Sequence, residues 1–222
     1  MFYAFTYMAR LLSGFGPASG MILALVATLF TGQYYSWLAA SVRKEKLEFQ
    51  DLKRFDASMF ILVLGVSFIL FVARLILSPM VSQPDTQWMV MLIYFFIVFG
   101  CNALPEAVYI HRYESIRAYA EALKFTKDNW IEWYLPFLIL LFPLFFLGGD
   151  IGDILHMFAL ISPLFPGVLI ISAWAMFLGG YGYAPVIFGF LIAHWFMLFR
   201  GFLYNELSSG SRRRRVYLAK QK

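Results

Sequence analysis

Long apolar runs follow one another along almost the whole chain, with only short polar segments between them. Five runs cover residues 20–40, 57–77, 134–147, 154–178 and 186–203, and a sixth begins at Trp88 and is broken near Pro105. A helix needs about 20 apolar residues to cross a bilayer, and a crossing segment must satisfy its own backbone hydrogen bonds. The sequence therefore predicts an all-α, polytopic integral membrane bundle of five or six transmembrane helices.

This number of spans nearly exhausts a chain of 222 residues and leaves no room for a separate soluble domain. We expect residues 1–207 to form a single transmembrane domain and residues 208–222 to form a basic, flexible tail. The composition agrees, because 61% of the residues are hydrophobic and 14% are charged, against about 45–50% and about 25% in soluble domains. Cys101 is the only cysteine, which excludes an intramolecular disulfide.

The net charge of +5 comes from basic residues that lie between the apolar runs and in the tail. Basic residues in these places are typical of cytoplasmic segments that contact anionic lipid headgroups, so nucleic acid is not an expected partner. We predict a multi-pass protein of the bacterial cytoplasmic (inner) membrane. Headgroup contacts are predicted for Arg43, Lys44, Lys46, Lys53, Arg54, Arg112, Arg117, Arg212, Arg213, Arg214 and Arg215.

The segment between the third and fourth apolar runs is amphipathic. Apolar residues recur at helical spacing in Tyr113, Ile116, Tyr119, Ala120, Leu123 and Trp130. Charges of alternating sign follow at steps of three or four in Glu114, Arg117, Glu121, Lys124 and Asp128. Such ion pairs contribute only about 0.2–0.5 kcal/mol each, so the apolar face must bind either the bilayer surface or neighbouring helices. We predict an interfacial helix over about residues 112–130.

The distribution of positive charge leaves the side of the C-terminus open. Residues 43–54 and 112–127 are basic and are both expected in the cytoplasm, two spans apart. Three crossings after Trp133 would then place the basic tail outside, against the same rule. Either the tail is an exception or one proline-broken run is re-entrant. The candidates for re-entrance are residues 134–147 and the stretch around 163–167.

The strongest polar candidates within the apolar runs are Asn102 and Glu106, which flank Pro105. Proline frees a backbone carbonyl inside a helix, and an asparagine or a water can satisfy it. Glu106 could bind a proton or a cation, or pair with His111 or Arg112. The favoured interpretation is a helix kink with a carboxylate near the membrane interface.

The other polar candidates are Asp150, Asp153 and His156, and His194. The first three could hold a divalent metal at one helix end, but helix capping is favoured because a fourth ligand is missing. His194 could ligate haem or relay protons, although a hydrogen bond to a neighbouring helix is the favoured role. Arg200 is expected to extend its side chain to the headgroups. No cofactor is expected.

Two stretches carry a resemblance to known families. Residues 32–35 read Gly-Gln-Tyr-Tyr and are followed by Arg-Lys-Glu-Lys at 43–46 and Asp-Leu at 51–52, and residues 121–130 read EALKFTKDNW. These stretches resemble the end of one span and the helix that enters another span in the DUF975 and glycerophosphodiester-phosphodiesterase membrane-domain-like families of bacterial multi-pass membrane proteins. The resemblance covers about a third of the chain. It implies a helical integral membrane protein, and it implies neither an established activity nor catalytic residues.

The sequence contains no phosphate-binding loop, no HExxH motif and no GxSxG motif. The leading hypothesis is therefore a non-enzymatic accessory or scaffold subunit that packs against a partner membrane protein complex or against a second copy of itself. Its 25 phenylalanines would provide broad apolar contact. The first alternative is a small transporter or channel-like protein for a lipid or hydrophobic solute, with its site at a broken span. The second is a lipid-headgroup enzyme that uses Asp150, Asp153 and His156.

Overall fold

The computed structural model describes residues 17–43, 55–81, 84–143, 163–164, 166–178 and 182–208. These residues form eight helices and no strands, so the predicted all-α fold is confirmed for this part of the chain. The helices are α2 (Pro17–Val42), α3 (Ala57–Val81), α4 (Pro84–Gly100), α5 (Leu104–Tyr109), α6 (Ser115–Asp128), α7 (Trp130–Leu140), α10 (Gly167–Phe177) and α11 (Tyr183–Ser208).

Three of these helices are long and apolar enough to cross a membrane. They contain the segments Gly20–Val42, Ala57–Met80 and Tyr183–Ser208. Shorter apolar helices cover Trp88–Gly100, Trp130–Leu140 and Gly167–Phe177. The predicted break in the third apolar run is confirmed, since α4 ends at Gly100 and α5 begins at Leu104.

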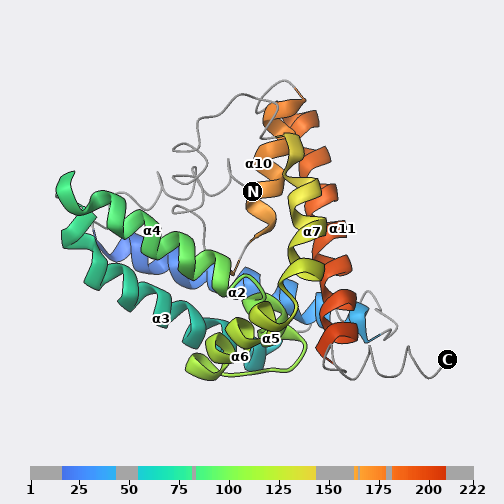
Figure 1. Ribbon diagram of the computed structural model, residues 1–222. Coiled ribbons are helices and arrows are strands. Elements are labelled where there is room, and N and C mark those ends of the chain that lie inside the picture. Colours follow the sequence, from blue (N-terminus) through green and yellow to red (C-terminus); the bar gives the residue numbers. More distant parts are fainter. Residues whose placement is uncertain are drawn as a thin grey trace.

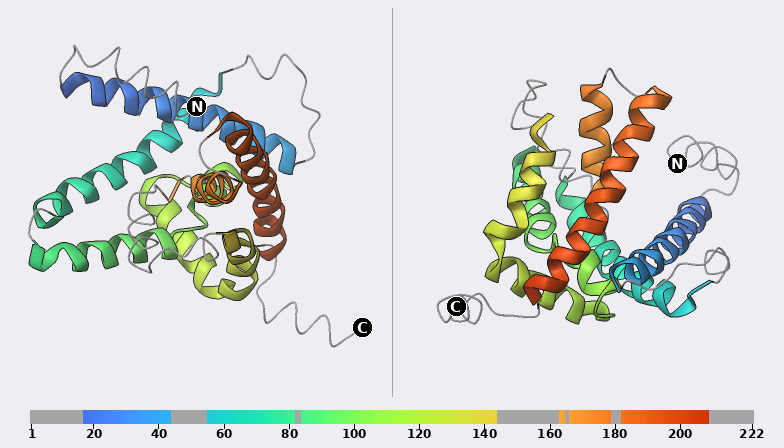
Figure 2. Two further views of the ribbon diagram at one scale, coloured as in Figure 1. Left: turned by 90° about the horizontal axis from the view of Figure 1, so that it is seen from above. Right: turned by 90° about the vertical axis from the view of Figure 1, so that its right-hand side faces the viewer.

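The helices form two arms that meet at a common base (Figures 1 and 2). One arm consists of α2, α3 and α4, and the other of α7, α10 and α11. The short helices α5 and α6 lie where the arms meet, and we call them, with the adjoining helix ends, the base. Buried hydrophobic residues concentrate there, including Tyr35 of α2, Tyr109 of α5 and Tyr204 of α11. By contrast, the outer half of α3 exposes apolar side chains such as Phe68, Phe71 and Leu75.

Close helix contacts hold each arm together. A Cβ atom at Gly189 would lie 2.9 Å from the carbonyl oxygen of Ile171, so glycine at this position lets α11 approach the backbone of α10. Small residues at helix crossings are the usual means of packing membrane helices. On α2, Gly32 lies in the same way against Phe60 of α3.

Helix α6 confirms that the charged segment after α5 is helical, with Ser115–Asp128 in place of the expected 112–130. Its buried face consists of Ala118, Ala122, Phe125 and Thr126. Ile116 and Leu123, which were expected on the apolar face, are 74% and 53% exposed. The inward face thus combines Phe125 with small residues that let α6 approach the core, whereas Ile116 and Leu123 point outward.

The alternating charges of α6 do not form the predicted ladder. No ion pair joins any two of its five charged residues, all of which lie in the described part of the chain. Arg117 instead lies with its guanidinium carbon 4.8 Å from the ring centroid of Tyr113. Ring contact of this kind is worth about 0.5–1 kcal/mol at an exposed site, so α6 depends mainly on its buried face.

The start of α3 is fixed by Asp56, whose carboxylate accepts several hydrogen bonds. Asp56 Oδ1 lies 2.6 Å from Ser58 Oγ and 3.1 Å from the Met59 amide nitrogen, and Oδ2 lies 3.0 Å from Ser36 Oγ. The Arg112 guanidinium, predicted to contact headgroups, pairs with Asp56 Oδ2 at 3.3 Å and also donates to Ser58. Arg112 adopts the left-handed backbone conformation, with φ of 54°.

Burial alone raises the pKa of the Asp56 carboxyl, but the three hydrogen bonds and the Arg112 charge outweigh it and lower the pKa. A carboxyl with a lowered pKa in the folded state contributes stability above its unfolded pKa and loses that contribution as the pH falls through the folded value. We expect Asp56→Ala to cost about 1 kcal/mol at neutral pH, as loss of a helix cap does. This difference from the wild type should shrink as the pH falls below the ordinary range of a carboxyl group.

Thermal unfolding in detergent at neutral and at acid pH measures this difference. Glu114→Ala is the matched control, because Glu114 precedes α6 but its side chain makes no cap hydrogen bond. A loss of the same size at both pH values would show that the Asp56 charge has no part in the cap.

Candidate functional site: a buried arginine cluster

The break between α4 and α5 frees backbone carbonyls inside the protein. The chain turns over residues 101–103, where the amide of Leu104 donates to the carbonyl of Cys101 at 2.9 Å. Pro105 occupies the first turn of α5, where its missing N–H costs no helix hydrogen bond. All six residues of α5 are buried, so the polar groups of this break need partners within the protein.

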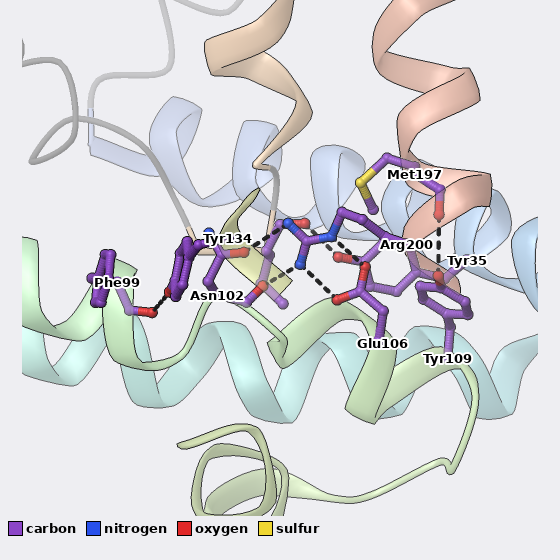
Figure 3. A network of polar contacts seen from close by, with 9 residues as sticks. Tyr35, Phe99, Asn102, Glu106, Tyr109, Tyr134, Met197 and Arg200 are labelled. Carbon is purple, nitrogen blue, oxygen red and sulfur yellow. Dashed lines mark hydrogen bonds and ion pairs between the residues drawn. The ribbon is translucent and has the colours of Figure 1, made fainter. Parts of the chain in front are cut away.

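Arg200 of α11 supplies those partners (Figure 3). Its Nε and Nη2 atoms donate to Oε1 and Oε2 of Glu106, each at 2.8 Å, which makes the ion pair bidentate. Nη1 donates to Asn102 Oδ1 at 2.7 Å, and Nη2 also donates to the backbone carbonyl of Asn102. Arg200 is 2% exposed and Glu106 is 0% exposed. A planar guanidinium fits this fork-to-carboxylate geometry better than lysine would.

Aromatic side chains cover the cluster. The guanidinium carbon of Arg200 lies 4.5 Å from the ring centroid of Trp133 on α7 and 5.6 Å from that of Phe196 on α11. Such cation–π contacts reach about 2 kcal/mol when water is excluded. Trp133 is itself buried. The charge is therefore held between a carboxylate and an aromatic face, away from solvent.

Tyrosine hydroxyls tie the surrounding elements to one another around this cluster. Tyr134 of α7 donates to the carbonyl of Phe99 at the end of α4, and the two rings stack with centroids 4.1 Å apart. Tyr109 of α5 donates to the carbonyl of Met197 of α11 at 3.4 Å. Tyr35 of α2 donates to the carbonyl of Leu164. Both arms thus share one polar network at the base.

The charged atoms of the cluster are hydrogen-bonded to one another or to Asn102. Both carboxylate oxygens of Glu106 accept from Arg200, and all three guanidinium nitrogens have an acceptor. The freed Asn102 carbonyl, which could bind a cation in a discontinuous helix, is occupied by the protein's own guanidinium. The geometry therefore clamps α11 to the α4–α5 break, and the charged groups of the cluster already have partners within the protein.

The structure corrects two of the predicted roles. Glu106 pairs with Arg200 and not with His111 or Arg112, and its side chain is fully buried within the protein. Arg200 does not extend to the headgroups, because α11 continues to Ser208 and the arginine lies on its buried face. The predicted importance of Asn102 and of the break at Pro105 agrees with the contacts found.

His194 makes the hydrogen bond to a neighbouring helix that the sequence analysis favoured. Its Nδ1 atom lies 3.1 Å from Tyr34 Oη of α2, and the two rings are 5.8 Å apart. The contact joins α2 and α11 one to two turns away from the arginine cluster.

Several predicted residues lie outside the described part of the chain. These are the suggested metal or capping group Asp150, Asp153 and His156, and the headgroup residues Lys44, Lys46, Lys53, Arg54, Arg212, Arg213, Arg214 and Arg215. Within the residues that are described, no group of three or more His, Cys, Asp and Glu side chains could hold a metal ion.

Comparisons with protein-family models, with curated proteins and with solved structures find no match for this chain. The resemblance noted in residues 32–52 and 121–130 stays a prediction from the sequence. The functional argument therefore rests on the contacts of the arginine cluster.

Proposed function

We propose that the protein is a non-enzymatic accessory or scaffold subunit that packs against a partner membrane protein complex in the cytoplasmic membrane. The observation that carries this proposal is the closure of the Arg200–Glu106–Asn102 cluster. Its ionisable groups bind one another in the buried base of the protein, so they support a fixed shape and not a catalytic or transport cycle.

The cluster also weighs against the transporter hypothesis. Transporters with discontinuous helices leave carbonyls and helix ends open to substrates and coupling ions near the midplane. Here Arg200 fills that position and Trp133 covers it. The enzyme hypothesis rests on Asp150, Asp153 and His156, which lie outside the described part of the chain.

The exposed faces supply the surface that a scaffold needs. The arm of α3 and α4 exposes Phe68, Phe71, Trp88 and Phe96, and α11 exposes Trp195. In a bilayer these side chains contact lipid tails or a partner helix, and aromatic residues are enriched where partners bind. Helix α6 would lie at the membrane interface with Ile116 and Leu123 outward, and its basic residues would contact anionic headgroups.

Mild-detergent purification from the native membrane, with quantification of every bound protein, tests the proposal. A scaffold should retain a protein partner at fixed stoichiometry, and Glu106→Gln should lower the amount of complex while the activity of each assembled complex stays unchanged. Glu114→Gln, an exposed carboxylate at the base, is the matched control. A protein that purifies alone with one lipid or solute class, and loses its transport on Glu106→Gln, would refute the scaffold role.

A further inference from the structure

The direction of each helix can be read from contacts relative to the base. On α2 and α3, Ser36 pairs with Asp56 and Gly32 lies against Phe60, so the two helices run in opposite directions. Since residue number rises toward the base on α2, α2 runs toward the base and α3 runs away from it. Helix α4 follows α3 after two residues, and Thr86 of α4 hydrogen-bonds the carbonyl of Met80, which makes a hairpin that returns to the base (Figure 2).

Helix α11 runs in the same sense as α2. Tyr34 contacts His194, and a Cβ atom at Gly201 would lie 2.6 Å from Val42 Cγ2. Residue numbers therefore rise together on the two helices, from 34 to 42 and from 194 to 201. Both helices end at the base.

Helices α7 and α10 both run opposite to α11. On α7, Trp133 lies at Arg200 and Phe137 stacks on Phe196 with ring centroids 5.8 Å apart. As residue numbers rise on α7, they fall on α11, so α7 runs away from the base.

The contacts of α10 show that it also runs opposite to α11. Its first residue, Gly167, lies against Ala193, and Ile171 lies against Gly189. The Trp174 indole donates to the carbonyl of Leu140 at 3.1 Å, which joins α7 to α10, and the two helices run in the same sense because both run opposite to α11. Since α7 begins at the base and α10 ends away from it, the two helices together lead from the base to the far side.

We infer that the base faces the cytoplasm, that α11 ends on that same side, and that residues 130–178 cross the membrane only once in net. This inference rests on the membrane placement proposed above. It gives five crossings, made by α2, α3, α4, the α7–α10 unit and α11.

The charges agree with this orientation. The described residues of the base carry Arg43, Arg112, Lys124 and Lys127 on exposed positions. In the outer halves of the described helices, Arg74 is the one basic residue and Asp85 the one acidic residue. Positive charge marks the cytoplasmic side.

The inference also removes the conflict over the tail. Residues 212–215 follow the base end of α11 in the sequence, so the tail shares the side of the segments after α2 and α5. All three basic segments then belong to one face. That face is the surface through which the protein would contact anionic headgroups, at about 1 kcal/mol for each basic residue near the membrane.

Cysteine accessibility in right-side-out membrane vesicles tests the inference. In a Cys101→Ala background, single cysteines would replace the exposed residues Asp85, Lys127, Tyr183 and Ser208. A membrane-impermeant maleimide should label the variants at 85 and 183 from outside. It should label those at 127 and 208 only after permeabilisation, and a permeant maleimide should label all four.

Labelling of Ser208→Cys from outside, with Lys127→Cys protected, would overturn the inference, since residues 130–178 would then cross an even number of times. Outside labelling of both positions 127 and 208 would overturn the cytoplasmic orientation of the base. The labelling pattern does not depend on a partner, so a failed scaffold role would leave it unchanged.

Discussion

Replacing Arg200 with methionine is expected to lower the free energy of unfolding by about 3–5 kcal/mol, the usual cost of removing one member of a buried ion pair. The substitution leaves the fully buried Glu106 without its partner, and it leaves the freed carbonyl of Asn102 without its donor. Reversible unfolding in mixed micelles, followed by circular dichroism, measures the loss.

Replacing both partners tests whether the loss of stability comes from an unpaired buried charge or from changed packing. Arg200→Met combined with Glu106→Met should recover most of the loss, because no buried charge stays unpaired. Glu114→Gln removes an exposed carboxylate from the same region and should change stability by less than about 0.5 kcal/mol. If Arg200→Met alone changed stability no more than Glu114→Gln, the pair would not hold the base together.

Substituting Gly201 with alanine is expected to destabilise the protein by about 1–3 kcal/mol through overpacking. The added Cβ would lie 2.6 Å from Tyr109 Oη and 2.6 Å from Val42 Cγ2, at the point where α11 meets α2 and α5. Tyr109 and Val42 are buried and have little room to move. The same unfolding measurement checks the loss.

Gly20→Ala is the matched control within a helix. A Cβ atom at Gly20 would meet nothing within 4 Å. Alanine there should be neutral or stabilising by about 0.5–1 kcal/mol, because it favours the helix more than glycine does. Equal effects at positions 20 and 201 would mean that α11 does not pack closely at the base.

The sequence could predict the membrane class and the position of most helices, because both depend on local patterns. Apolar runs at 20–40, 57–77 and 186–203 correspond to α2, α3 and α11. The periodicity of the charged segment located α6, and Pro105 located the break after α4. Each of these signals lies within a single stretch of the chain.

The pairing of Arg200 with Glu106 could not be predicted from local patterns, since 94 residues separate the two partners. A weaker signal was present on α11. Gly189, Ala193 and Gly201 recur at helical spacing, and Arg200 lies next to this small-residue face, which membrane helices usually turn toward their neighbours. The buried face of α6 was missed for a related reason, because its alanines gave no strong apolar signal beside Ile116 and Leu123.

The arginine cluster holds α11 of one arm against the break that follows α4 of the other, and so fixes one arm against the other. The most direct test is a distance measurement by pulsed electron paramagnetic resonance between spin labels at Leu75 on α3 and Leu191 on α11, both exposed, in a Cys101→Ala background in lipid bilayers. We expect one narrow distance distribution in the parent and a broad one after Arg200→Met. An equally narrow, unshifted distribution after Arg200→Met would contradict the claim.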